Sequence, residues 1–243
     1  MILAVDAGNS NIVLGCMEGL EIRHTLRLKT DRAMSAAGYT VTLQAALAQA
    51  GFSVAGFEGG ILSSVVAAVT EPLRQVVGKT AKTTLPLCID QPETIGADLI
   101  AAAEGALAQY APPLVLIDMG TATTFSVLDK SGAFLGGAIA PGVQLGAEAL
   151  TQRTGLPMTE LSAPQSPLSH STTDCLRSGI IYGAAAMVDG VLDRLETALG
   201  TPVTTIATGG LARCVIPHCR RPVTLDDQLL LRGLAVMYRR EMT

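Results

Sequence analysis

The segment Ile2-Leu-Ala-Val-Asp6-Ala-Gly8-Asn9-Ser10-Asn11 recurs in altered form as Leu114-Val-Leu-Ile-Asp118-Met-Gly120-Thr121-Ala-Thr123-Thr124. In each copy a short apolar run, typical of a buried strand, ends at an aspartate and turns through a glycine. The glycine lets the backbone approach a ligand, and neighbouring N–H groups can point at phosphate oxygens. Because a carboxylate alone would repel phosphate, the aspartates indicate that a metal ion takes part. One Asp-x-Gly pair is often only a turn, but two copies after equivalent strands predict a duplicated nucleotide-binding fold.

Both turns are followed by the same order of elements. Further strand patterns cover 12–16, 21–28, 125–128 and 133–139, and glycines at 19 and 132 supply the positive φ that short hairpins need. Helical patterns then cover 38–50, 71–82, 142–153 and 173–199. Strands followed by helices, twice over, predict two similar α/β lobes that face a central cleft.

Composition narrows the function further. The chain has 243 residues, of which 49% are hydrophobic and 16% charged, so it can bury one large or two modest cores. With a net charge of −4 and no dense run of Lys or Arg, it lacks the basic patch that is typical of proteins that bind nucleic acids. No segment reads as a membrane span or a leader, so we expect a cytoplasmic protein that does not bind membranes.

The five cysteines suggest reduced thiols rather than a disulfide framework, because their number is odd and they are scattered. Cys214, His218 and Cys219 lie close together in the sequence. They offer too few ligands at suitable spacing to predict a metal site.

Three further segments are candidates for a site. Asp98 precedes the alanine-rich stretch 100–108, so it falls at a helix start, where free N–H groups favour a carboxylate. Position alone leaves open that Asp98 is only a helix cap. The segment 136–142 has too many glycines for a regular strand and predicts a shaped loop, either a pocket wall or a plain connection. Thr208-Gly-Gly210 follows an apolar run, and its glycines would let a base or ribose lie against the backbone.

Taken together, these motifs resemble the superfamily of sugar kinases, actin and Hsp70, whose ribonuclease H-like lobes bind ATP. Within it, the chain is similar to the type III pantothenate kinases from residue 1 to about residue 240. The motifs that carry this resemblance are Asp6-Ala-Gly-Asn-Ser, Ser63-Ser-Val, Gly96-Ala-Asp98, Asp118-Met-Gly-Thr-Ala-Thr-Thr124, Gly136-Gly-Ala-Ile-Ala-Pro-Gly142, Ser178-Gly179 and Thr208-Gly-Gly210. The resemblance implies actin-like lobes at 1–112 and 113–243, ATP-dependent phosphorylation of pantothenate to 4′-phosphopantothenate, the first step of coenzyme A biosynthesis, and a homodimer with substrate sites near its interface.

The resemblance also assigns roles to individual positions. Asp98 would be the catalytic proton acceptor, and Asp118 the ligand of a monovalent cation, K⁺ or NH₄⁺. Asp6 would hold Mg²⁺ through water. The ATP-binding residues would be Asp6, Ala7, Gly8, Asn9, Ser10, Asn11, Ile12, Val13 and Thr121. The pantothenate-binding residues would be Gly96, Ala97, Asp98, Leu99 and Thr172.

The chain departs from the family pattern at the substrate segment. Leu99 stands where the family pattern Gly-Ala-Asp-Arg has arginine, and Ile89 replaces a frequent tyrosine. Leucine cannot make the charge-assisted hydrogen bond of an arginine, which typically contributes about 1.5–3 kcal/mol. A neighbouring cation such as Arg27 or Arg153 could take over this role. Two alternatives therefore stay open beside the kinase: a kinase for a less anionic substrate, and a catalytically silent dimeric regulator that binds nucleotide.

Overall fold

The computed structural model describes residues 1–242. The chain forms two compact units. The first comprises residues 1–109 together with the segment that begins at Gln228, and the second comprises Tyr110–Asp227.

The first unit is built on a mixed sheet of five strands in the order β3-β2-β1-β4-β5. The strands are β1 (Ile2–Ala7), β2 (Asn11–Glu18), β3 (Glu21–Lys29), β4 (Gly59–Ser64) and β5 (Gly78–Thr80). β1 pairs antiparallel with β2 and parallel with β4. Gly19, with φ +67°, closes the predicted hairpin between β2 and β3.

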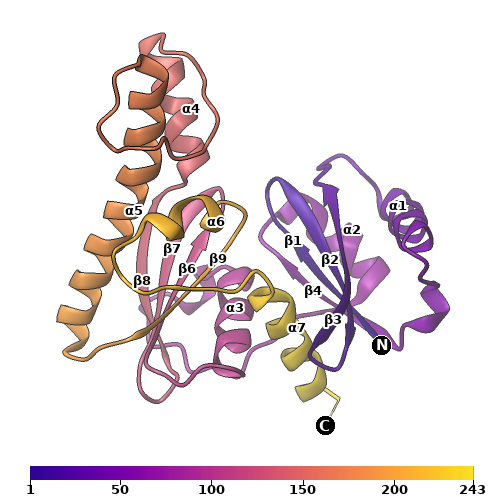
Figure 1. Cartoon of the computed structure of the whole chain (residues 1–243). Helices are drawn as coiled ribbons and strands as arrows, with labels where there is room; N and C mark the ends of the chain where they lie inside the picture. Colours follow the sequence, from indigo (N-terminus) through magenta and orange to yellow (C-terminus); the bar gives the residue numbers. More distant parts are fainter. Residues whose placement is uncertain (243) are drawn as a thin grey trace. The chain divides into compact units, whose positions relative to one another are not determined.

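Helices cover both faces of this sheet (Figure 1). On one face α1 (Ala36–Gln49) and α2 (Ala67–Val77) bury Tyr39 and Leu73 against side chains such as Leu14. On the other face α3 (Ala97–Leu107) and α7 (Leu229–Arg240) bury Ala101 and Leu234. Two short 3₁₀ helices, Val54–Gly56 and Pro92–Thr94, lie in the connections.

The second unit repeats the sheet, in the order β10-β9-β6-β7-β8. Its strands are β6 (Leu114–Met119), β7 (Ala122–Leu128), β8 (Phe134–Pro141), β9 (Thr204–Thr208) and β10 (Thr224–Leu225). β6 pairs antiparallel with β7 and parallel with β9, as β1 does with β2 and β4. Asp6 and Asp118 both stand fifth in a central strand of six residues. The predicted duplicated α/β fold is therefore confirmed.

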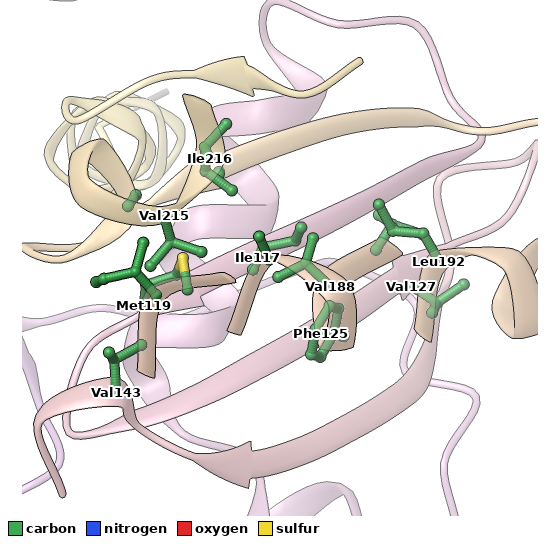
Figure 2. Packing of buried hydrophobic residues seen from close by; sticks show 14 residues of the cluster. Ile117, Met119, Phe125, Val127, Val143, Val188, Leu192, Val215 and Ile216 are labelled. Carbon is green, nitrogen blue, oxygen red and sulfur yellow. The ribbon is translucent and has the colours of Figure 1, made fainter. Parts of the chain in front are cut away.

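The core of the second unit lies between its sheet and the long helix α5 (Thr172–Leu199). Figure 2 shows Ile117, Phe125 and Val188 packed together in this cluster, with Val215 of α6 (Ala212–Val215) beside them. The remaining helices are α4 (Val143–Thr154) and the 3₁₀ turn Ile216–His218. Among the helices of residues 1–242, α5 alone is long and apolar enough to cross a membrane; one face of it, which includes Ile181 and Val188, packs in the core of the second unit.

Two predictions about secondary structure were wrong. Residues 136–141 are not a shaped loop but belong to strand β8, and only Gly142 lies beyond it. The glycines are needed there because a Cβ at Gly137 would lie 1.6 Å from the carbonyl oxygen of Phe125 on β7. The helix expected over 71–82 ends at Val77, because Gly78 has φ +96° and residues 78–80 pair with β4.

The carboxyl-terminal helix α7 packs with the first unit, whereas the lobe expected from the sequence placed it in the range 113–243. The cause is a close contact between two helices. A Cβ at Gly233 of α7 would lie 1.7 Å from the carbonyl oxygen of Ala101 on α3, so only glycine permits this approach. Such a contact between distant segments leaves no periodic pattern in the sequence.

Candidate active site

Asp6 lies near the carboxyl end of β1, on the sheet face that α3 and α7 cover. Its direct neighbours in the strand register are Ser63 on β4 and Val13 on β2. Paired residues share one face of a sheet, so Asp6 and Ser63 form a polar pair. The Ser63 hydroxyl is fully buried and has no hydrogen-bond partner among the described residues. A buried orphan hydroxyl marks a position where a ligand or water completes the hydrogen bonding.

The turn after β1 is held in shape by the segment that follows β3. The Gly8 amide donates to the carbonyl oxygen of Asn11 at 2.9 Å, which closes the turn. The Thr30 hydroxyl donates to the Gly8 carbonyl at 2.7 Å, and the Thr30 amide donates to the Ser10 carbonyl at 3.1 Å. The Arg32 guanidinium donates to Asn9 Oδ1 at 3.0 Å. Thr30 and Arg32 were not among the residues predicted from the sequence, because their contacts with the turn depend on the pairing of distant segments rather than on a local motif.

Asp98 stands in the first turn of α3, as predicted, and Gly96 is the N-cap. Its Oδ1 accepts a hydrogen bond from the Leu99 amide at 2.8 Å. A Cβ at Gly96 would lie 2.3 Å from the same oxygen, so the glycine leaves room for the carboxylate. Burial raises the pKa of Asp98, and the backbone N–H groups of Leu99 and Asp98 itself offset only part of this rise. Asp98 is therefore a stronger proton acceptor than an exposed aspartate.

Helix packing places Asp98 at the same end of the sheet as Asp6. Ala101 of α3 belongs to one buried cluster with Ala4 and Ile61, which lie two residues before Asp6 and Ser63 on their strands. Asp98 precedes Ala101 by about 4.5 Å of helix rise, or nearly one turn. A Cβ at Gly96 would touch Val65, just beyond the carboxyl end of β4. The first unit thus gathers the phosphate-type turn, the orphan hydroxyl and the candidate base.

Asp118 occupies the equivalent position in the second unit. Its register partners are Thr208 on β9 and Thr124 on β7. The Thr124 hydroxyl is buried and lacks a hydrogen-bond partner among the described residues. Gly209, with φ +94°, brings its backbone against Asp118: a Cβ there would lie 2.5 Å from Asp118 Oδ1. The predicted Gly-Gly segment therefore lies beside the second aspartate.

The turn between β6 and β7 is closed by the Gly120 amide, which donates to the Ala122 carbonyl at 3.0 Å. Thr121 at its tip is exposed. Gly142 lies directly against this turn, since a Cβ there would be 2.2 Å from the Thr121 carbonyl oxygen. The end of β8 thus supports the turn, although the sequence analysis read it as a loop.

Thr172 lies elsewhere in the second unit. It is the first residue of α5 and is exposed. The amino-terminal part of α5 extends with α4 beyond the sheet (Figure 1). The preceding segment is tied to α5 by three side chains: Arg177 donates to the Ser162 carbonyl at 3.0 Å, Ser178 to the Pro167 carbonyl at 2.6 Å, and Tyr182 to the Pro164 carbonyl at 3.1 Å. These hydrogen bonds hold the segment that leads to Thr172 against α5.

His218 and Cys219 pack against other parts of the second unit. The His218 ring contacts the Tyr182 ring edge to face, with 5.1 Å between centroids. Burial raises the pKa of Cys219 to about 12, so this thiol stays protonated and unreactive. No group of three or more His, Cys, Asp or Glu side chains within residues 1–242 is arranged to hold a metal ion.

Solved structures share this architecture across the whole chain. The Acidaminococcus fermentans (R)-2-hydroxyglutaryl-CoA dehydratase component A covers 100% of the chain with a TM-score of 0.66 at 13% identity, and the chain covers 99% of it. The ROK hexokinase of Thermus thermophilus covers 99%, with a TM-score of 0.57 at 14% identity, and the chain again covers 99% of it. At these identities the likeness concerns the fold alone. The two sheets with their acidic turns define a protein of the actin-like and ROK-like class with duplicated ribonuclease H-like lobes.

Sequence relatives identify the particular family. Residues 2–194 match the family model for type III pantothenate kinase. Type III pantothenate kinases from an Exiguobacterium species and from Pelobacter propionicus are 38% and 36% identical to the chain, each over 99% of both sequences. The enzyme of Moorella thermoacetica is 34% identical over the same share. The chain belongs to the type III pantothenate kinase family, and its activity is the phosphorylation of pantothenate in coenzyme A biosynthesis.

Proposed function

We propose that residues 6–13 and Thr121 bind ATP through its phosphate groups. The support is the shape of the two turns: hydrogen bonds hold both backbones, and Gly142 approaches the second turn so closely that only glycine fits there. A turn that is already ordered loses little entropy when it binds phosphate. The activator of 2-hydroxyisocaproyl-CoA dehydratase from Clostridium difficile, which has this fold with a TM-score of 0.62 at 14% identity, was solved with ADPNP bound.

Asp98 is the proposed proton acceptor, and residues 96–99 with Thr172 form the proposed pantothenate site. As the substrate hydroxyl oxygen bonds to the γ-phosphorus and the bond to ADP breaks, the hydroxyl proton passes to the Asp98 carboxylate. The raised pKa of Asp98 favours this transfer. The single observation that carries the assignment is this partly desolvated carboxylate in the first turn of α3, the helix that packs on the sheet face to which Asp6 and Ser63 belong.

The residues around both aspartates fit the cations that the resemblance implies. Asp6 and the Ser63 hydroxyl offer hard oxygen atoms, and Mg²⁺ in kinases is usually held by one or two carboxylates together with substrate phosphates. At Asp118, one carboxylate and the Thr124 hydroxyl suit a monovalent cation, K⁺ or NH₄⁺. When bound, these cations neutralise charge on the phosphate oxygens during transfer.

Leu99 leaves the pantothenate site without the cation expected at this position. It lies partly buried in the first turn of α3, and its backbone amide is bonded to Asp98. An apolar side chain there can cover the substrate but cannot pair with its carboxylate. We expect weaker pantothenate binding than arginine would give, with the transfer chemistry unaltered. Membership of the family favours this reading over a silent regulator.

The proposed enzyme is a cytoplasmic homodimer. Apolar side chains of the second unit remain exposed, including Ile139 at 78% and Leu168 at 74%, which suits an interface. Light scattering on purified protein tests the dimer, and a monomeric mass at micromolar concentration would exclude it.

ADP release with pantothenate, ATP, Mg²⁺ and potassium tests the assigned roles directly. We expect pantothenate-dependent turnover in the parent and its loss in Asp98→Ala. Glu93→Ala, which removes an exposed carboxylate just before α3, is the matched control and should keep full activity. Equal activity of Asp98→Ala and the parent would remove Asp98 from the mechanism.

A further inference from the structure

A row of paired residues crosses the first sheet at the level of Asp6. Ser63 pairs with Asp6, Asp6 pairs with Val13, and Val13 pairs with Arg27 on β3. All four side chains therefore share one face of the sheet. Neighbouring strands are about 4.8 Å apart, so the backbone of Arg27 lies two strand spacings, or about 10 Å, from the backbone of Asp6.

Lys29 extends the same face. It pairs with Asn11 at the end of the phosphate-type turn, and it is two residues from Arg27, so both side chains leave β3 on one side. The alternate residues Leu26 and Leu28 pack into the opposite core with α1 and α2. This alternation fixes the direction of the two cations.

Both cations are available to a ligand. Arg27 and Lys29 are exposed, and neither has a hydrogen bond or ion pair within residues 1–242. Arg23 on the same strand is instead held by Glu18 and Glu21, at 2.7 Å each. Two unpaired cations beside this turn attract an anion, in a chain whose net charge is −4.

The order of the strands indicates which part of the site Arg27 and Lys29 adjoin. Arg27 and Lys29 lie on the β3 side of Asp6, whereas the amino end of α3 with Asp98 lies against the end of β4, on the other side of β1. Lys29 is thus paired with Asn11 of the turn, whereas β3 and β4, whose end the amino end of α3 contacts, are three strand spacings apart in the sheet. Arg27 therefore does not take the position that Leu99 leaves vacant.

We propose that Arg27 and Lys29 bind the phosphate chain of the nucleotide, with Arg27 as the principal contact. This assignment rests on the proposed phosphate-binding role of residues 6–13 and adds to it the side-chain cations. A guanidinium can bind two phosphate oxygens at once in a fixed geometry, which an ammonium cannot. The cations offset the repulsion between phosphate and the Asp6 carboxylate.

The test compares ADP and adenosine binding by calorimetry in Arg27→Met, Lys29→Met and the control Arg23→Met. We expect Arg27→Met to weaken ADP binding about tenfold or more, Lys29→Met to weaken it less, and Arg23→Met to have little effect. Adenosine, which has no phosphate, should bind all variants equally. Arg27→Lys should recover part of the ADP affinity, because it restores charge but not the two-point contact.

A fifth variant separates the proposed role of Arg27 from the proposed phosphate-binding role of the turn on which it rests. Gly8→Val places a side chain in the turn, where an added Cβ would lie 3.3 Å from the Asn11 carbonyl oxygen. If Gly8→Val leaves ADP affinity intact, the phosphate role of the turn is wrong. If Gly8→Val weakens ADP binding but Arg27→Met does not, only the role of Arg27 is overturned. An equal loss of adenosine and ADP affinity in Arg27→Met would also overturn it.

Discussion

Gly209 presses its backbone against Asp118: a Cβ on Gly209 would lie 2.5 Å from Asp118 Oδ1 and 2.6 Å from the Met119 amide nitrogen. The residue also has φ +94°, which L side chains rarely adopt. Two segments about ninety residues apart in the chain thus define one side of the carboxylate. Any side chain at position 209 must displace either the strand end or the aspartate.

Replacing Gly209 by alanine should therefore damage both stability and the response to potassium. We expect a loss of about 1–3 kcal/mol in the free energy of unfolding, from backbone strain. We also expect a higher potassium concentration for half-maximal activity, because Asp118 is displaced. Denaturant unfolding and a potassium titration of turnover measure the two effects.

Gly200→Ala provides the control for strain alone. Gly200 has φ +67° but no atoms within 4 Å of its Cβ position. It should lose stability without any change in potassium dependence. An unchanged potassium requirement in Gly209→Ala would show that the contact does not position Asp118.

The raised pKa of Asp98 predicts how activity and stability depend on pH. The value of kcat/KM should rise with pH as Asp98 deprotonates, and the pH at the midpoint of this rise should lie above the pKa of an exposed aspartate. The folded protein keeps this proton to higher pH than the unfolded chain. Stability therefore falls as the pH rises from the unfolded to the folded pKa, and the loss remains at neutral pH.

Asp98→Asn removes this titration while keeping the size of the side chain. We expect the variant to lose about 10²–10⁴-fold in kcat and to gain stability relative to the parent as the pH rises from about 4 to about 7. Denaturant unfolding at both pH values measures the stability difference. A difference between parent and variant that does not change with pH would contradict the shifted pKa.

Leu99→Arg should strengthen pantothenate binding. A charge-assisted hydrogen bond contributes about 1.5–3 kcal/mol, which corresponds to about a tenfold or greater fall in the KM for pantothenate. The KM for ATP should stay the same, and Leu99→Met, which adds no charge, should resemble the parent. A pantothenate KM that rises or stays constant in Leu99→Arg would show that residue 99 does not contact the substrate carboxylate.

The local parts of this structure could be predicted from the sequence. Both Asp-x-Gly turns follow strands, Asp98 lies in the first turn of a helix, and Gly19 and Gly132 close hairpins with φ +67° and +83°. Each depends on a few neighbouring residues with special backbone or capping preferences. The roles of the site residues themselves stay predictions until the variants are measured.

The remaining parts depend on contacts between distant segments. The pairing of Ser63 with Asp6 and the bonds of Thr30 to the turn follow from strand register, which no local motif encodes. The glycine-rich end of β8 reads as a loop unless the Phe125 carbonyl oxygen beneath Gly137 is known. Arg27 lies on the Asp6 face for the same non-local reason.

The last prediction concerns the contact that holds α7 against α3 in the first unit. Glu104 on α3 is only 4% exposed and accepts hydrogen bonds from Thr83 at 2.8 Å and from two Arg240 nitrogens at 2.9 Å each. Glu104→Gln keeps the shape but removes the charge and turns an amide N–H₂ group toward donors. We expect it to lower the free energy of unfolding by about 1–3 kcal/mol, because a buried polar group loses its partner.

Urea unfolding of Glu104→Gln beside Glu71→Gln tests this prediction. Glu71 pairs with Arg74 on the surface, and that bond lowers the pKa of Glu71 to about 2, yet solvent screening makes such exposed pairs weak. Glu71→Gln should therefore change stability little. If the two variants lose equal stability, the link between α3 and α7 depends on the close packing of Gly105 and Gly233 rather than on this ion pair. A much larger loss in Glu104→Gln alone would show that the buried carboxylate holds the carboxyl-terminal helix in place.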